Sequence, residues 1–211
     1  GVFDQQRPRV LTALVRGKTL LVPSARKALS TARALKSKIR HPVWALGKAR
    51  LGRESDCEPG SVLFLGFDFR YTGNSRALFE EVLKDDRFSG RSIRFATRDD
   101  RVPAAMRIEP ESLEFLRFAE RAEYVVAETW IPPSVPKHPS STWIQLWHGT
   151  PIKRMLFDSH EREITSMRPD HKVKKYRDIL RWDYFVVDSE EAVDRFATAF
   201  LIPHEKLLRT Q

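Results

Sequence analysis

From residue 61 onward, hydrophobic and polar residues alternate between short apolar runs and helical patterns. The apolar runs are six residues long and rich in β-branched and aromatic residues, which favours buried strands. These runs predict strands at 61–66, 92–97, 123–128, 142–147 and 183–188. Helical periodicity predicts helices at 74–85, 110–122 and 189–201, the last with Ser189 as its N-cap.

Continuous apolar strands separated by helices are typical of a mainly parallel sheet that is covered on both faces. The sequence therefore predicts an α/β fold with a Rossmann-like sheet. In such sheets, ligands bind beyond the carboxyl ends of the strands. The sequence has no Gly-x-Gly-x-x-Gly dinucleotide motif and no internal repeat, and no apolar run approaches the roughly 20 residues of a transmembrane helix.

The net charge of +9 is concentrated in the first quarter of the chain. Residues 1–55 hold 13 Lys and Arg but 2 Asp and Glu, whereas residues 56–211 hold 24 and 26. Together with Pro59 and Gly60, this shift predicts a basic helical extension or linker over 1–58 and a Rossmann-like domain over 59–211. The single cysteine, Cys57, excludes a disulfide within the chain and suits a reducing compartment.

Within the basic extension, residues 24–40 have the composition of a helix, with Ser24 as a candidate N-cap. Small apolar residues recur on one face and basic residues crowd the rest, which would suit a peripheral anchor on an anionic membrane. A solvated helix packed on the next domain, or a linker to an upstream domain, explains the pattern equally well. Nucleic acid is not an expected partner, because aromatic residues do not interleave with the charges.

The stretch TWIQLWHGTPIKRMLFD, residues 142–158, combines a predicted strand with candidate chemistry. His148 directly follows the strand, so we expect it at the carboxyl edge of the sheet. An imidazole there could take a proton from an alcohol that attacks phosphorus. A structural hydrogen bond is the alternative role for a single histidine.

The residues after His148 predict an anion site. Gly149 would let a ligand approach the main chain closely, and Thr150 and Pro151 have the pattern of an N-cap and first helical residue. The amides of such a helix start, with Lys153 and Arg154 nearby, would bind a phosphate.

Further candidates have structural alternatives. Asn74 could bind a ligand at the end of the first strand, although Asn74 or Ser75 could instead be a helix N-cap. Asp158 could orient a ligand hydroxyl or pair with Arg154 on the same helix. The end of the fifth strand, at Asp188, could contribute to the site or to helix capping.

Two other features lead to weaker predictions. The basic segment 168–183 could contact polymer phosphates, or it could be a solvated helix face. The six histidines show no metal-ligand spacing, so no metal site is expected.

Three segments resemble one family. WIQLWHGTPIK (143–153) resembles the signature of the CDP-glycerol glycerophosphotransferases, the bacterial teichoic-acid primases and polymerases. GFDFRYTGNSRALFEEVLKD (66–85) is similar to the family's first strand, loop and helix. RWDYFVVDSEEAVDRFATAF (181–200) is similar to its Trp-Asp-Tyr strand and following helix. The resemblance spans roughly residues 61–211.

This resemblance implies the acceptor-side half of a two-domain glycosyltransferase-B architecture, with the donor pocket expected in a second domain outside this chain. It implies that His148 is catalytic and activates an acceptor hydroxyl, which attacks the β-phosphorus of CDP-glycerol and releases CMP. The residues expected to bind substrate or phosphate are Asn74, Gly149, Thr150, Pro151, Lys153 and Asp158.

No cofactor is expected beside the donor substrate CDP-glycerol. The expected partners are a lipid-linked polyol-phosphate or glycan acceptor and an anionic membrane surface, at the cytoplasmic face of a bacterial membrane. Two alternatives stay open: a sugar-nucleotide-dependent glycosyltransferase of the same fold, and a non-catalytic membrane-binding module in which residues 1–55 are the functional part.

Overall fold

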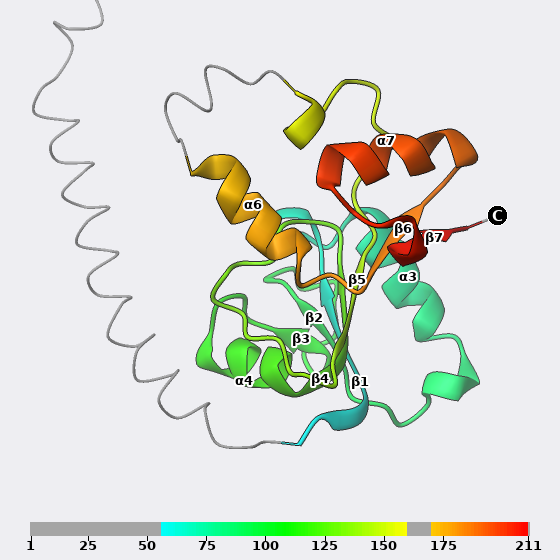
Figure 1. Cartoon of the computed structure of the whole chain (residues 1–211). Coiled ribbons are helices and arrows are strands. Elements are labelled where there is room, and N and C mark those ends of the chain that lie inside the picture. Colours follow the sequence, from blue (N-terminus) through cyan, green and yellow to red (C-terminus); the bar gives the residue numbers. More distant parts are fainter. Residues whose placement is uncertain (1–55, 160–169, 211) are drawn as a thin grey trace, which may run out of the picture. The chain divides into compact units, whose positions relative to one another are not determined.

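The computed structural model describes residues 56–159 and 170–210 (Figure 1). These residues belong to one of the two units into which the chain divides, Glu54–Gln211. The helix predicted over 24–40 lies outside the described residues, as does nearly all of the predicted extension 1–58.

The described residues form a seven-stranded sheet in the order β3-β2-β1-β4-β5-β6-β7, and every neighbouring pair is parallel. The predicted Rossmann-like α/β fold is therefore confirmed. The strands are β1 (Glu58–Leu65), β2 (Ile93–Ala96), β3 (Arg107–Ile108), β4 (Ala122–Ala127), β5 (Thr142–Gln145), β6 (Tyr184–Val187) and β7 (Leu207–Arg209). All five predicted strands are present, and the two that the hydrophobic pattern missed, β3 and β7, are short strands at the sheet edges.

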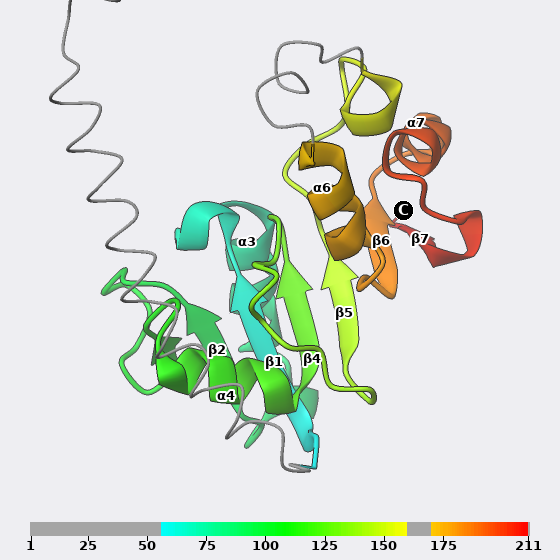
Figure 2. The ribbon, with the colours of Figure 1, turned by 60° about the vertical axis from the view of Figure 1, so that its left-hand side comes forward.

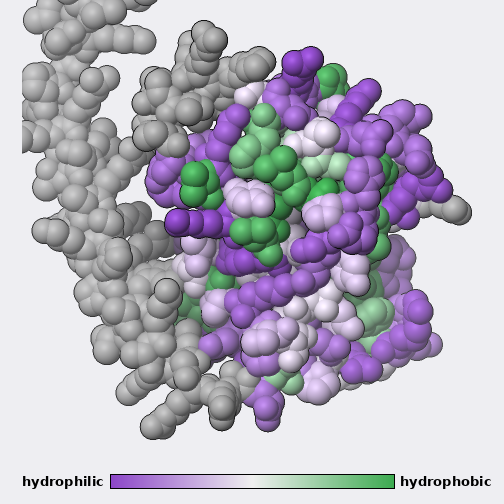
Figure 3. All heavy atoms as spheres, in the orientation of Figure 1, coloured by the Kyte–Doolittle hydropathy of each residue, from purple (hydrophilic) through white to green (hydrophobic). Residues whose placement is uncertain are grey.

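The helices are α3 (Gly73–Val82), α4 (Leu113–Arg121), α6 (His171–Ile179) and α7 (Glu190–Phe200). The predicted N-cap of α7 is confirmed, because Ser189 Oγ accepts a hydrogen bond from the Ala192 amide at 3.3 Å. Figures 1 and 2 show α3 and α4 on opposite faces of the sheet. Figure 3 shows hydrophobic residues gathered around α6, where Val173 and Leu180 are exposed.

The core has two aromatic groups. One, built on Phe64, Phe79 and Phe95, packs α3 against β1 and β2. The other lies at the β5–β6 side of the sheet and comprises Trp130, Trp147, Trp182, Phe185, Phe196 and Phe200. This second group forms the floor beneath the carboxyl end of β5. No helix in the described ranges combines the length and hydrophobicity that crossing a bilayer requires.

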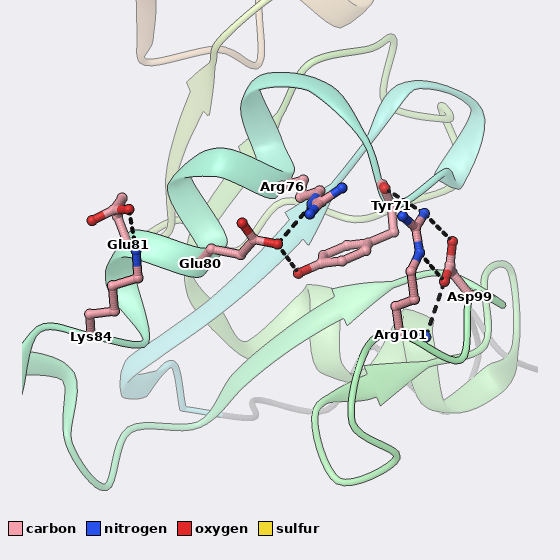
Figure 4. Close-up of polar contacts among 7 residues, drawn as sticks. All are labelled: Tyr71, Arg76, Glu80, Glu81, Lys84, Asp99 and Arg101. Carbon is pink, nitrogen blue, oxygen red and sulfur yellow. Dashed lines mark hydrogen bonds and ion pairs between the residues drawn. The ribbon is translucent and has the colours of Figure 1, made fainter.

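The loop between β1 and α3 is held in place by Tyr71, which is 6% exposed (Figure 4). Its hydroxyl donates to Glu80 Oε1 at 2.9 Å, and Arg76 Nε donates to the same oxygen at 2.7 Å. Arg101 donates to the Tyr71 carbonyl at 3.2 Å and pairs with Asp99. Burial, with the hydrogen bond to Glu80 second, raises the pKa of Tyr71. The loop that begins α3 is therefore tied both to α3 itself and to the segment after β2.

Candidate functional site

His148 lies just beyond the carboxyl end of β5, and its side chain is exposed, so its predicted location is confirmed. Its Nδ1 atom lies 2.9 Å from the main-chain carbonyl oxygen of Glu128, the residue that follows β4. A carbonyl oxygen can only accept, so Nδ1 must carry the proton in this contact. In the neutral imidazole, Nε2 then keeps its lone pair and can accept a proton from a ligand.

Two aromatic rings fix the plane of the imidazole. Trp147 stacks on it with ring centroids 4.2 Å apart, and Phe67 meets it edge-on at 4.9 Å. Trp147 is buried and packs on Trp130 and Phe200 at 5.4 and 4.8 Å. The exposed histidine therefore stands on a rigid, buried aromatic support.

Trp147 adopts a left-handed main-chain conformation, with φ of 56°. Such a conformation costs a non-glycine residue on the order of 1 kcal/mol or more, and it persists where surrounding contacts hold it. Here the Trp147 amide donates to Gln145 Oε1 at 3.1 Å, and Gln145 Nε2 donates to the Thr129 carbonyl at 2.9 Å. Asn74 Nδ2 donates to the Trp147 carbonyl at 3.2 Å. Gly149 follows with φ of 145°, in a region that favours glycine.

The helix predicted to begin at Thr150 and Pro151 is absent, and that prediction was wrong. Residues 150–155 contain no helix, and within 150–159 the only helical turn is a 3-10 helix at Leu156–Asp158. Thr150 donates its hydroxyl proton to Asp188 after β6, and Arg195 on α7 donates to the Pro151 carbonyl at 3.2 Å. These contacts hold the segment against α7. An anion that binds here therefore cannot be held by the free amides of a helix start.

The other predicted binding residues of this segment line a second surface. Lys153 and Arg154 are exposed and border a groove of about 730 Å³ between residues 151–158 and α7. Asp158 Oδ2 in this groove accepts a hydrogen bond from Thr198 at 2.7 Å. The alternative of an Arg154–Asp158 pair on one helix was wrong, because no helix contains both residues.

Asn74 lies beside the loop that follows β5 and carries His148, here called the histidine loop, as a ligand-binding role would require. The alternative of Asn74 or Ser75 as an N-cap was wrong, because Thr72 precedes the first helical residue, Gly73. Both side chains instead contact residues outside α3, Asn74 the Trp147 carbonyl and Ser75 Oγ the Leu65 carbonyl at 3.0 Å.

A cavity of about 620 Å³ opens between α3 and the histidine loop. Its walls are mainly apolar, with Asn74, Glu80, Glu81, Asp188 and Thr210 as polar residues. Gly149 lines the cavity and Pro151 lines the groove along α7, so the chain runs from one to the other within three residues. His148 lines neither of them, and its exposed ring lies next to the cavity, one residue before Gly149.

The basic helix predicted within 168–183 is present as α6, and its lysines differ in environment. Lys174 is exposed and pairs with Asp170 at 2.5 Å, which fits the solvated-face alternative. Lys175 lies with its Nζ 3.9 Å from the centroid of the Trp130 ring, and burial lowers the pKa of Lys175 to about 8. Within 56–159 and 170–210, no group of three or more His, Cys, Asp or Glu could hold a metal ion.

Two residues of the site were not found from the sequence, Glu128 and Gln145. Both are almost completely buried, at 2% and 0% exposure. The sequence predicts each as part of an apolar strand. The available signal was a polar residue at the carboxyl end of an otherwise apolar strand, on the strand that leads to His148 or on its neighbour.

Comparisons with known proteins identify the family and the fold. Residues 49–210 match the family model described as CDP-Glycerol:Poly(glycerophosphate) glycerophosphotransferase. The chain is 30% identical over 152 residues to a teichoic acid poly(glycerol phosphate) polymerase of Bacillus subtilis, a match that covers 66% of this chain and 19% of the relative. It is 26% identical over 160 residues to the protein of the same name in Staphylococcus epidermidis, with 74% and 22% covered.

Among solved structures, the wall teichoic acid polymerase TagF aligns with a TM-score of 0.70 and 21% identity, over 89% of this chain and 47% of that chain. A TagF variant soaked with CDPG aligns with a TM-score of 0.71 and 22% identity, over 89% and 47%. These similarities support the fold. The chain spans about a fifth of the length of the two curated relatives.

Proposed function

Since this chain belongs to the CDP-glycerol:poly(glycerophosphate) glycerophosphotransferase family, we propose that it is the acceptor-side part of a glycerophosphotransferase. The proposed reaction transfers glycerol phosphate from CDP-glycerol to a hydroxyl of a lipid-linked teichoic-acid or capsule-type acceptor, with release of CMP.

The observation that carries the proposal is the contact between His148 Nδ1 and the Glu128 carbonyl oxygen at 2.9 Å. With Nδ1 donating to the Glu128 carbonyl, Nε2 accepts the proton of the acceptor hydroxyl as that oxygen attacks the β-phosphorus. A new phosphorus–oxygen bond forms and the bond between the two phosphoryl groups of the donor breaks, so CMP leaves. Asn74 and the segment Gly149, Thr150, Pro151, Lys153 and Asp158 bind substrate in this proposal.

The remaining parts of the proposal concern groups outside the described residues. The donor's nucleotide binds in a second domain of the full-length protein, as the partial span of the relatives supports. Residues 1–55, with their excess of basic side chains, contact an anionic membrane at its cytoplasmic face.

The test is CMP release from CDP-glycerol by the full-length protein with a lipid-linked acceptor. We expect His148→Ala to lower the rate by roughly 10²-fold or more while the fold is retained. His138→Ala is the matched control, because His138 precedes β5 at the opposite end of that strand and should leave the rate unchanged.

Each other outcome has a distinct meaning. An unchanged rate for His148→Ala would remove this histidine from the mechanism. Consumption of a sugar nucleotide instead of CDP-glycerol would keep the fold and change the donor. Absence of any turnover, with liposome binding that survives loss of His148, would favour a membrane-binding module.

A further inference from the structure

We propose that Glu128 is a positioning residue for His148, an inference that rests on the proposed role of His148 as general base. Glu128 follows β4, the neighbour of the strand that carries His148, and it is 2% exposed. It would act through its main chain on the imidazole and through its carboxylate on the two segments that flank the imidazole.

All the hydrogen-bonding groups of Glu128 are used. Its amide donates to the Leu65 carbonyl at 3.1 Å, which extends the β4–β1 pairing by one residue. Its carbonyl accepts from His148 Nδ1 at 2.9 Å. Its carboxylate accepts from two amides, Phe67 N at 3.0 Å on Oε1 and Ser75 N at 2.8 Å on Oε2. One residue therefore joins β1, the loop after β1, the first turn of α3 and the histidine.

The two amides bound by the carboxylate belong to segments that touch the imidazole or its support. The ring of Phe67 meets the imidazole edge-on, at 4.9 Å between centroids. Asn74, next to Ser75, holds the carbonyl of Trp147 at 3.2 Å. Loosening the carboxylate would therefore release the imidazole from both sides, while the carbonyl of the same residue fixes which nitrogen carries the proton.

The surroundings of the buried Glu128 side chain favour a carboxylate. It occupies the N-terminal end of α3, where the helix dipole and free amides favour an anion. Gly73 makes room for it, because a Cβ on Gly73 would lie 2.6 Å from Glu128 Oε1. A carboxylate suits this position better than an amide, since two N–H donors converge on it and a glutamine has one acceptor oxygen.

The first experiment compares kcat and KM for CMP release in the full-length protein and its variants. We expect Glu128→Gln to lower kcat by roughly 10-fold, with little change in the KM for CDP-glycerol, because the loss concerns the geometry of the base. In a His148→Ala background, the same substitution should cost less than about 2-fold, since residues that act as a unit are not additive.

Asp183→Asn is the matched control. Asp183 also accepts two hydrogen bonds, from the Trp143 amide at 2.7 Å and from Lys137, but at the amino end of β6. A general loss of stability would affect both variants alike, whereas a positioning role predicts a fall in kcat for Glu128→Gln alone.

The second experiment does not depend on activity. In ¹⁵N NMR of the histidine side chains, wild-type His148 should show Nδ1 protonated and Nε2 unprotonated when the ring is neutral. Glu128→Gln keeps the main-chain carbonyl, but it loosens the segments on both sides of the ring and so weakens the contact of that carbonyl with Nδ1. This variant should therefore show exchange between the two tautomers. Glu128→Asp keeps the carboxylate but shortens the side chain by one methylene, and it should show the same exchange. It replaces Glu128→Gln in the test if the glutamine variant does not fold.

The outcomes separate the two proposals. If wild type releases no CMP, the proposed function fails, and the tautomer of His148 in the variants still decides the role of Glu128. The positioning role is overturned if both Glu128 variants keep the wild-type tautomer. It is also overturned if Glu128→Gln costs as much with His148 absent as with His148 present.

Discussion

The side-chain amide of Asn74 donates a hydrogen bond of 3.2 Å to the main-chain carbonyl of Trp147, which joins the first turn of α3 to the residue before His148. Trp147 needs such support, because its φ of 56° is unfavourable for a tryptophan. The contact therefore couples a helix on one face of the sheet to the orientation of the exposed imidazole.

We expect Asn74→Asp to lower kcat for CMP release by about five-fold, the equivalent of a hydrogen bond of about 1 kcal/mol. An aspartate cannot donate to the Trp147 carbonyl when it is ionised, although it has nearly the same shape. Steady-state kinetics of the full-length protein measures this, with Lys84→Ala near the other end of α3 as the control. A kcat equal to wild type would show that this bond does not contribute to the active geometry.

Gly73 and Gly90 offer a matched pair for the contact with Glu128. Their φ values are +69° and +73°, so an alanine is strained to a similar degree at both positions. A Cβ on Gly73 would clash with the Glu128 carboxylate, whereas a Cβ on Gly90 would meet nothing within 4 Å.

We therefore expect Gly90→Ala to lower the free energy of unfolding by about 1 kcal/mol and Gly73→Ala by at least about 1 kcal/mol more. Only Gly73→Ala should also lower kcat. Chemical denaturation together with the CMP assay measures both effects. Equal losses of stability in the two variants would mean that the space around Glu128 can adjust to a methyl group.

The secondary structure was largely predictable, because six-residue apolar runs and helical periodicity depend on local sequence. The edge strands β3 and β7 have two and three residues, too few to form such a run. The location of His148 was predictable because the carboxyl ends of parallel strands face one edge of the sheet.

The loop after His148 could not be predicted in the same way. Its path depends on Thr150 bonding to Asp188 and on Arg195 bonding to Pro151, and these partners lie 38 and 44 positions away. The Thr-Pro pair has the local pattern of a helix start, but the tertiary contacts override it. Glu128 was hidden for a related reason, since its partners Phe67 and Ser75 come from a segment far away in the sequence.

Lys153 and Arg154 allow a test of the proposed phosphate contacts, since both are exposed beside the groove along α7. We expect the double change Lys153→Glu and Arg154→Glu to raise the KM for a polyanionic acceptor by roughly 10-fold at low salt. The effect should shrink above about 0.1 M salt, where the screening length falls to about 10 Å.

Steady-state kinetics over a series of salt concentrations measures this dependence. Arg117→Glu on α4 changes one exposed charge away from the groove and is the control. A rise in KM that is independent of salt would point to distortion of the loop instead of a contact with phosphate.

Lys175 makes the free energy of unfolding depend on pH, and its lowered pKa fixes the direction of that dependence. Burial lowers the pKa of Lys175 from 10.5 to about 8, so the charged side chain is less favourable in the folded state than in the unfolded state. Below pH 8 both states carry the proton, and the folded state bears the full cost. Between pH 8 and 10.5 the unfolded state binds more protons, so the stability contributed by this group rises with pH.

We therefore expect Lys175→Met to be most stabilising relative to wild type near pH 7, and the difference to shrink as pH rises from about 8 to 10.5. The contact of Lys175 Nζ with the Trp130 ring, at 3.9 Å, opposes this by favouring the charged form. Urea denaturation of both proteins at several pH values measures the balance. A difference that stays constant from pH 7 to 10.5 would show that the cation–ring attraction offsets the cost of burial.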